Sequence, residues 1–138
     1  MNIGNPMKNK NLQKTDNLNE IILNSVNEYI RVVDKQYNVI FENTPMQEHL
    51  GKTEGKKCYE FWKETAPCEN CVSATVRDDR SERIREVEID NKYFRVKCYP
   101  IILSDGSCEE TVEIIADITV QKKLIKNWKI IRNSLKKK

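Results

Sequence analysis

Hydrophobic residues near the start of the chain follow first a helical pattern and then a strand pattern. Within residues 18–26, apolar side chains recur three or four positions apart, which predicts a short helix capped by Asp16 or Asn17. The apolar stripe of this helix consists of Leu18, Ile21, Ile22 and Val26. Residues 29–34 and 37–42 are rich in β-branched and aromatic side chains, so they predict two short strands that form a hairpin.

The middle of the chain has the pattern of short helices separated by loops. Residues 43–51 predict a helix that ends at Gly51. Pro67 disfavours helical backbone at the residue before it, so a turn at residues 58–62 is separated from a later helix that we expect to begin near Cys68. The residues that we expect on one face of this later helix are Cys71, Val72, Thr75 and Val76.

Three long runs of strand character follow, at residues 83–90, 92–103 and 110–118. Short polar turns separate them, which favours neighbouring antiparallel strands. Alternation in the middle run places Phe94, Val96 and Cys98 on one face and Arg95, Lys97 and Tyr99 on the other. Antiparallel strands with one covered face account for this pattern.

The last segment, residues 121–135, predicts a helix whose apolar residues are spaced four, three and four positions apart. These residues are Leu124, Trp128, Ile131 and Leu135. They form a heptad seam, and the opposite surface is mostly lysine and polar residues. Two heptads are too short to hold a dimer together in water on their own. The seam must therefore gain stability from the domain or continue in a longer coiled coil.

Length and composition indicate one folded domain with solvated ends. The chain has 138 residues, of which 38% are hydrophobic and 33% are charged. We expect a disordered lead-in over residues 1–15, the domain over 16–120, and an amphipathic signalling or dimerisation helix over 121–138. No apolar run approaches the ~20 residues that cross a membrane, and the N-terminus lacks the apolar segment of a secretory signal. We therefore expect a cytoplasmic chain whose cysteines are reduced.

The charge of the chain does not indicate a nucleic-acid or membrane partner. The net charge is +3, and Lys136, Lys137 and Lys138 alone account for it. No basic face interleaved with aromatic residues is apparent in the remainder. The sequence also contains no recognisable Ser-His-Asp set, paired carboxylates or phosphate-binding glycine-rich loop, so we do not expect an enzyme.

Three of the five cysteines fall within fourteen residues, in a Cys-x8-Pro-Cys-x2-Cys pattern that begins at Cys58. The two-residue gap between Cys68 and Cys71 lets one turn of backbone direct both sulfur atoms to a common point, as a tetrahedral metal site or a redox dithiol requires. Cys98 points with the core residues of its strand. Metal binding, a reversible disulfide and inert buried thiols all remain open for this set. Cys108 lies beside a turn, where we expect an exposed residue without a role.

The order of elements and three segments of sequence resemble the PAS family of sensory domains. The segments are residues 21–34 (IILNSVNEYIRVVD), 39–43 (VIFEN) and 114–119 (IIADIT). The resemblance implies an α+β fold, in which a five-stranded antiparallel sheet carries short helices on one face and is flanked by an N-terminal helix and a C-terminal signalling helix. It also implies that Asp117, Ile118 and Thr119 relay a signal from the domain to the exit helix.

By this resemblance we expect a signal-transduction sensor that forms a homodimer and acts on an output kinase or regulator, as in two-component systems. The stimulus would be a metal ion or cluster, a redox change or a small ligand, detected in a pocket that contains Cys58, Cys68, Cys71 and Cys98. Two alternatives remain. One is a dimerisation or protein-interaction module with inert cysteines, and the other is a receptor for an apolar small molecule.

The cofactors of the family match this sequence unequally. A light-sensing flavin site would present an Asn-Cys-Arg type of motif, which Asn70, Cys71 and Val72 match only in part. Haem commonly needs an axial histidine, and the single histidine is His49, on the helix before Gly51. Four convergent thiolates would instead suit zinc or an iron-sulfur cluster. The residues that we expect to line a ligand pocket are Tyr59, Phe61, Trp62, Phe94 and Val96.

Overall fold

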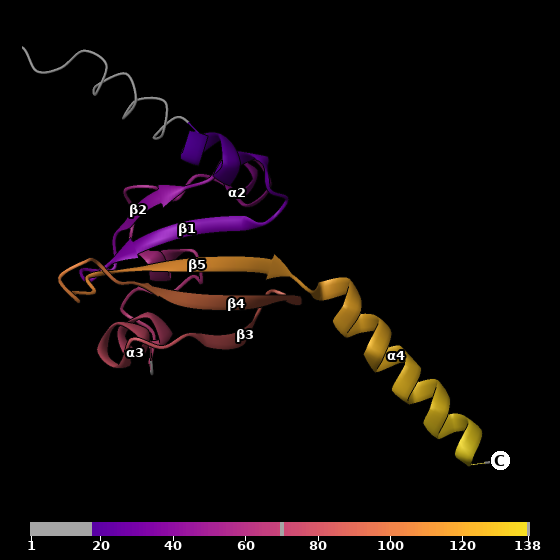
Figure 1. Cartoon of the computed structure of the whole chain (residues 1–138). Coiled ribbons are helices and arrows are strands. Elements are labelled where there is room, and N and C mark those ends of the chain that lie inside the picture. The colour runs from indigo at the N-terminus through magenta and orange to yellow at the C-terminus, as the bar shows by residue number, and fades with distance from the viewer. Residues whose placement is uncertain (1–17, 70, 138) are drawn as a thin grey trace, which may run out of the picture.

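The computed structural model describes residues 18–69 and 71–137 as one antiparallel sheet with short helices and a long exit helix (Figure 1). Residues 18–25 are helical. The strands are β1 (Tyr29–Asp34), β2 (Val39–Glu42), β3 (Arg83–Ile89), β4 (Lys92–Ile101) and β5 (Glu110–Asp117). The helices are α2 (Thr44–Leu50), the short 3-10 helix η1 (Cys58–Glu60), α3 (Val72–Asp79) and α4 (Thr119–Lys136).

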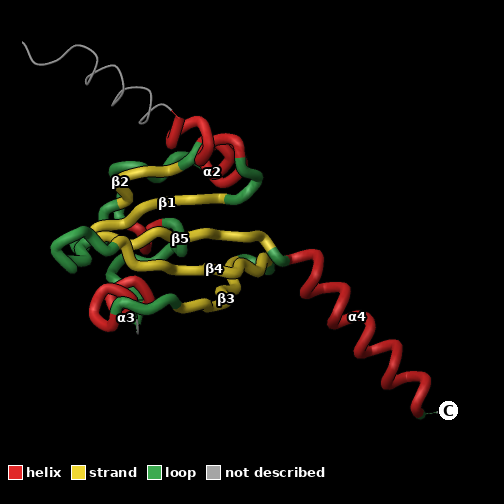
Figure 2. Tube along the Cα trace, in the orientation of Figure 1, coloured by secondary structure: helices red, strands yellow, loops and turns green. Residues whose placement is uncertain are grey.

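The five strands are hydrogen bonded in the order β2-β1-β5-β4-β3, and every neighbouring pair is antiparallel (Figure 2). Alternation along β4 buries Phe94, Val96 and Cys98, as the sequence pattern predicts. Val96 lies opposite Ile115 of β5, and both join Met46 of α2 in the hydrophobic core. The predicted α+β fold with a five-stranded antiparallel sheet is therefore confirmed.

Four strands are shorter than predicted: β4 ends at Ile101 and not at residue 103, β5 ends at Asp117 and not at residue 118, and turns shorten β2 and β3. β2 begins at Val39 because Tyr37 has a positive φ of 69° in the preceding turn. β3 ends at Ile89 because Asp90 and Asn91 have φ values of 51° and 64°. Two consecutive positive φ angles are typical of the tight hairpin turn that matches the twist of antiparallel strands.

The predicted helix over residues 43–51 corresponds to α2, which Asn43 caps. The side-chain oxygen of Asn43 accepts hydrogen bonds from the backbone N–H groups of Met46 and Ile30, at 3.2 and 3.0 Å. Its amide nitrogen donates to the carbonyl oxygens of Leu23 and Glu28. This fully buried side chain therefore caps a helix and also ties α2 to β1 and to the N-terminal helix.

The helix after the cysteine-rich loop begins at Val72, so our prediction of a start near Cys68 is wrong. Its buried residues are Ser73 and Val76, whereas Thr75 is exposed. The prediction that Thr75 shares the buried face is therefore also wrong. The buried face of this short helix therefore carries a polar residue, Ser73, together with Val76.

Apolar stripes at both ends of the domain are exposed in this chain. In the N-terminal helix the exposed residues are Leu18, Ile21 and Ile22. In α4 they include Leu124, Trp128, Ile131 and Leu135. None of the 18 residues of α4, all of which are described, is buried, and Figure 1 shows this helix running away from the sheet.

Within residues 18–69 and 71–137, no helix is long and apolar enough to span a bilayer. The predicted lead-in over residues 1–15 lies outside the described residues.

Candidate functional site

Four cysteines from three separate segments line one cavity between the sheet and its helical cover. Cys58 begins η1, Cys68 and Cys71 lie in the loop before α3, and Cys98 lies on β4. Cys58 and Cys98 are buried, while Cys68 and Cys71 are half-buried, and all are free thiols. Residues that are up to 40 positions apart in the sequence thus present sulfur to the same space.

The volume of this cavity is about 30 Å³. A water molecule needs roughly 10–15 Å³ of such space, so the cavity has room for one ion or one or two waters. A larger groove of about 410 Å³ lies beside it and shares Trp62, Cys68 and Arg85 as lining residues. The groove and the cavity therefore adjoin at these three residues.

The two buried thiols are held in their neutral form. Burial raises the pKa of the Cys58 thiol to about 12, and the nearby Glu113 carboxylate adds to the effect. Burial also raises the pKa of Cys98 to about 11, although a hydrogen bond with Ser73 opposes the shift. At neutral pH both groups are thiols, so any process that needs thiolates must displace their protons.

The sulfur atoms surround the cavity without forming a ligand set. In the part of the chain that the structure describes, no group of three or more His, Cys, Asp or Glu side chains is positioned to hold a metal ion. Metal coordination by three or four of these cysteines would require the lining segments to move closer together.

The predicted ligand-pocket residues divide between the cavity and the core. Trp62 and Val96 line the cysteine cavity. Phe61 and Phe94 pack against Trp62, with ring centroids 4.6 and 5.8 Å from it. Tyr59 packs instead beside Cys58 in a second hydrophobic cluster. Cys108, which we expected to be exposed, is half-buried, and its sulfur lies 3.6 Å from the carbonyl oxygen of Glu110.

A buried polar network that we did not predict lies against the cavity. The Arg31 Nε atom donates to a carboxylate oxygen of Glu113 at 2.7 Å, and the other oxygen of Glu113 accepts from the Ser73 hydroxyl at 3.0 Å. The Ser73 hydroxyl also lies 3.6 Å from the sulfur of Cys98. Strand alternation over residues 29–34 and 110–117 was the signal that would have placed Arg31 and Glu113 on the inner face.

The segment predicted to relay the signal is attached to β4. The N–H group of Ile118 donates to the carbonyl oxygen of Tyr93 at 2.8 Å, and the N–H group of Tyr93 donates to the Thr119 hydroxyl oxygen at 2.9 Å. Asp117 accepts from the N–H group of Thr119 at 2.9 Å. Lys122 of α4 adds an ion pair with Glu86 of β3 at 2.6 Å. The start of α4 is thus coupled to the edge of the sheet.

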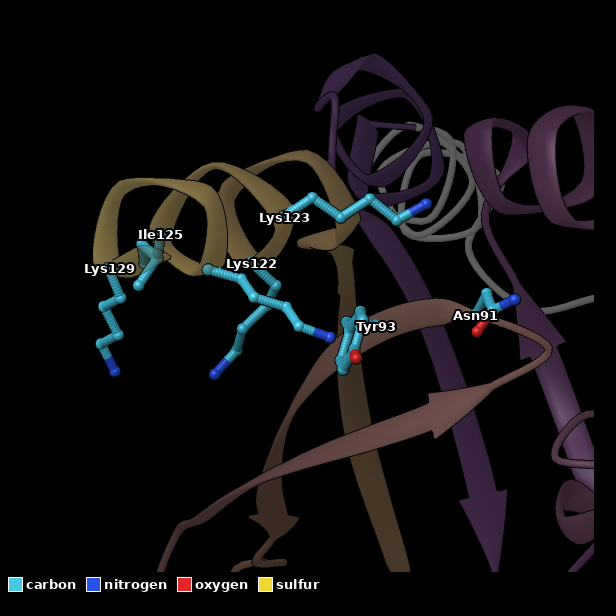
Figure 3. Close-up of a pocket in the computed structure, with 7 residues that line it drawn as sticks. Asn91, Tyr93, Lys122, Lys123, Ile125 and Lys129 are labelled. Atoms are coloured by element: carbon cyan, nitrogen blue, oxygen red, sulfur yellow. The ribbon is translucent and has the colours of Figure 1, made fainter. Parts of the chain in front are cut away.

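A groove of about 350 Å³ lies where α4 meets the β3–β4 turn (Figure 3). Its lining residues are Asn91, Tyr93, Lys122, Lys123, Ile125, Lys126 and Lys129. The lysine side chains come from α4, whereas Tyr93 and Asn91 belong to β4 and the turn before it. The groove shares no lining residue with the cysteine cavity, although Tyr93 and Cys98 belong to the same strand.

The residues near the cavity do not fit haem or flavin. Sites for molecules of that size occupy several hundred Å³, whereas the cysteine cavity measures about 30 Å³. His49, the candidate haem ligand, is exposed on α2, with its ring centroid 5.7 Å from that of Tyr29. Asn70, part of the motif compared with flavin sites, lies outside the described residues.

Comparison with solved structures relates this architecture to sensory proteins. A sensory box sensor histidine kinase from Vibrio cholerae is 18% identical, with a TM-score of 0.56 over 85% of this chain and 98% of that chain. The PAS domain of BvgS from Bordetella pertussis is 16% identical, with a TM-score of 0.56 over 87% and 97%. A PAS domain from Colwellia psychrerythraea is 15% identical, with a TM-score of 0.58 over 76% and 98%. No family model and no curated protein matches the chain. At these identities the likeness shows a shared fold.

Proposed function

We propose that this chain, which has the PAS fold, is the sensor domain of a signalling protein and receives its signal as a thiophilic metal ion in the cysteine cavity. Zn²⁺ and Cu⁺ are the ions that a set of thiolate ligands selects. One observation carries the proposal: four cysteines from three segments line a single cavity whose volume suits one ion. This volume favours a single ion over an iron-sulfur cluster.

The cavity also suggests how metal binding would produce a structural change. Cys58 and Cys98 are buried within the domain, whereas Cys68 and Cys71 lie on the loop between η1 and α3. Because the sulfurs are not yet placed as ligands, coordination would draw this loop toward the sheet. A stimulus that binds one arrangement more tightly than another shifts the population of the two, which is what a sensor requires.

A route from the loop to α4 is present in the hydrogen bonds of the domain. Ser73, near the start of α3, donates to Glu113 of β5, and β5 leads directly into α4. Movement of the loop would therefore act on the strand that precedes Asp117, Ile118 and Thr119. The exposed seam of α4 would pair with that of a second copy, and the paired helices would pass the change to an output kinase or regulator.

Metal analysis of anaerobically purified protein tests the proposal. We expect about one equivalent of zinc or copper per chain, retained through desalting. Cys68→Ser should remove most of this metal, and Cys108→Ser should not, because Cys108 does not line the cavity. Equal metal contents in these two variants, or metal-free wild-type protein that takes up neither ion, would contradict the proposal.

A reversible disulfide between Cys68 and Cys71 is the second candidate signal. These two thiols are less buried than Cys58 and Cys98 and stand on one loop, so an oxidant reaches them first. Forming the disulfide releases two protons and transfers two electrons to an oxidant such as a peroxide. Peptide mass spectrometry after peroxide treatment would find this crosslink in metal-free protein if the switch operates.

A further inference from the structure

Positive charge is concentrated in the exit helix. Residues 119–138 contain eight lysines and arginines and no aspartate or glutamate, whereas residues 1–118 contain 16 basic and 21 acidic side chains. The net charge of +3 therefore conceals an acidic domain joined to a strongly basic helix. Such asymmetry is typical of a segment that binds an anionic partner.

Four lysines of this helix line the groove between α4 and the β3–β4 turn, and the lining contains no carboxylate (Figure 3). Lys122 forms an ion pair with Glu86 at 2.6 Å. Within residues 18–69 and 71–137, no carboxylate pairs with Lys123, Lys126 or Lys129. A concave surface lined by one sign of charge attracts ions of the opposite sign. The groove therefore attracts anions.

The spacing of these lysines is unfavourable for the helix itself. Lys126 follows Lys122 by four positions and Lys123 by three. Lys129 follows Lys126 by three. Like charges at these spacings are neighbours on the helix surface and destabilise it, and cations near the start of a helix oppose its dipole. A bound anion would relieve both effects, so it would also stabilise the first turns of α4.

The other lining residues give the groove an apolar wall beside the ammonium groups. Tyr93 of β4 is half-buried, and Ile125 of α4 is exposed. Nucleobases stack on aromatic side chains. The volume of about 350 Å³ lies within the range of sites for small organic molecules. An anion that also carries a flat ring, as a nucleotide does, can therefore use both parts of the groove.

Acidic residues beside the groove oppose a long polyanion. Glu88 of β3 lies opposite Tyr93 in the strand register, and Asp90 precedes Asn91 in the turn. Glu88 and Asp90 are both exposed. A nucleic-acid duplex requires an extended basic surface, and these carboxylates interrupt it. A short anion held between α4 and the turn avoids them.

We propose that this groove binds a nucleotide through its oligophosphate group. The ammonium groups of Lys123, Lys126 and Lys129 hold the phosphates, and the ring of Tyr93 packs against the base. The proposal does not depend on metal binding by the cysteines. Tyr93 lies on the outer face of β4, whereas Cys98 lies on the inner, buried face.

The position of the groove gives such a ligand a direct effect on the exit helix. The backbone of Tyr93 holds the start of α4 through hydrogen bonds with Ile118 and Thr119, at 2.8 and 2.9 Å. A nucleotide in the groove contacts Tyr93 and the lysines of α4 together. It would therefore fix the orientation of α4 relative to the sheet, as a second input at the junction through which a signal leaves the domain.

Isothermal titration calorimetry at low salt, with ATP and no added divalent metal, tests the site. The double variant K126Q/K129Q removes two charges from the groove, and we expect it to bind ATP at least about tenfold more weakly than wild type. The control K136Q/K137Q removes the same charge from the end of the helix, outside the groove, and should stay within about twofold. Glutamine is as good a helix former as lysine, so both variants should fold.

Tripolyphosphate distinguishes a nucleotide site from a site for inorganic phosphate chains. It lacks a base, so we expect wild-type protein to bind ATP more tightly. Tyr93→Leu should weaken the binding of ATP and leave that of tripolyphosphate unchanged. If this variant does not fold by circular dichroism, the ratio of the two affinities in wild-type protein decides the question. Equal affinities of wild-type protein for ATP and tripolyphosphate would contradict the nucleotide assignment.

Hydrogen exchange provides a second measurement that does not depend on binding heats. ATP should slow amide exchange at the start of α4 in wild-type protein and in K136Q/K137Q, but not in K126Q/K129Q. Absence of ATP binding by wild-type protein would overturn the proposal. Equal losses of affinity in the two double variants would also overturn it, because they would show attraction to the basic helix as a whole.

Discussion

The hydroxyl group of Ser73 in α3 donates a 3.0 Å hydrogen bond to the carboxylate of Glu113 in β5. Ser73 is buried, and its oxygen also accepts from the Thr111 hydroxyl at 3.3 Å. This contact joins the helical cover to the strand that continues into α4. It is a direct side-chain contact between the helix that follows the cysteine-rich loop and the strand that leads into the exit helix.

Ser73→Ala should weaken the attachment of α3 to the sheet without removing a cysteine. The variant leaves one oxygen of Glu113 and the Thr111 hydroxyl without this partner, and we expect a loss of about 1–3 kcal/mol in the free energy of unfolding. Urea denaturation measures this loss. Ser134→Ala, on the exposed face of α4, is the control and should stay within about 0.5 kcal/mol of wild type. Equal stabilities would contradict a structural role for the contact.

Thiol reactivity should divide the cysteines into two groups. Burial raises the pKa of Cys58 to about 12 and that of Cys98 to about 11, so at pH 8 at most roughly one in a thousand of these groups is a thiolate. Since the thiolate is the reactive form, native protein treated with iodoacetamide at pH 8 should be modified first at the half-buried Cys68, Cys71 and Cys108. Peptide mass spectrometry over time gives the rates.

The pH dependence of alkylation follows from the same raised pKa values of Cys58 and Cys98. A raised pKa means that the thiolate fraction of Cys58 and Cys98 still increases about tenfold for each pH unit above 8, so their rates should continue to rise through pH 9 and 10. In urea, where the burial is lost, all five cysteines should react at similar rates. Rapid native modification of Cys58 or Cys98 at pH 8 would show that these thiols are not held neutral.

Removal of the Asn43 side chain should destabilise the N-terminal half of the domain. Asn43→Ala removes the cap of α2 and leaves the buried N–H group of Ile30 without its side-chain acceptor. We expect a loss of about 2 kcal/mol in the free energy of unfolding, measured by thermal or urea denaturation. Asn133→Ala, on exposed α4, should have little effect. A loss below about 0.5 kcal/mol for Asn43→Ala would contradict this role.

Strong local signals explain why much of the fold could be predicted from the sequence. Alternating side chains in β4, the cap and end of α2, and the order of the elements all point to the same sheet. The start of α3 could not be predicted, because the backbone remains non-helical for several residues after Pro67 and no strong capping residue marks the helix start.

The candidate site could be predicted from the sequence only in part. The spacing of Cys58, Cys68 and Cys71 singled out three lining residues, and strand alternation added Cys98. The ion pair of Arg31 and Glu113 was not predicted, because charged residues are expected at the surface. Strand alternation indicates the inner face for both residues, and the register of β1 against β5 shows that they lie opposite each other.

The exposed seam of α4 should be the dimer contact. Trp128 is 60% exposed and stands in the heptad stripe, whereas Ile130 is equally exposed but lies outside that stripe. Trp128→Glu would place a charge in the middle of the paired helices, so we expect it to convert a dimer into a monomer. Sedimentation equilibrium over a range of protein concentrations measures the change. Ile130→Glu adds the same charge to the same helix and should leave the dimer intact, and equal effects of the two substitutions would contradict pairing through this seam.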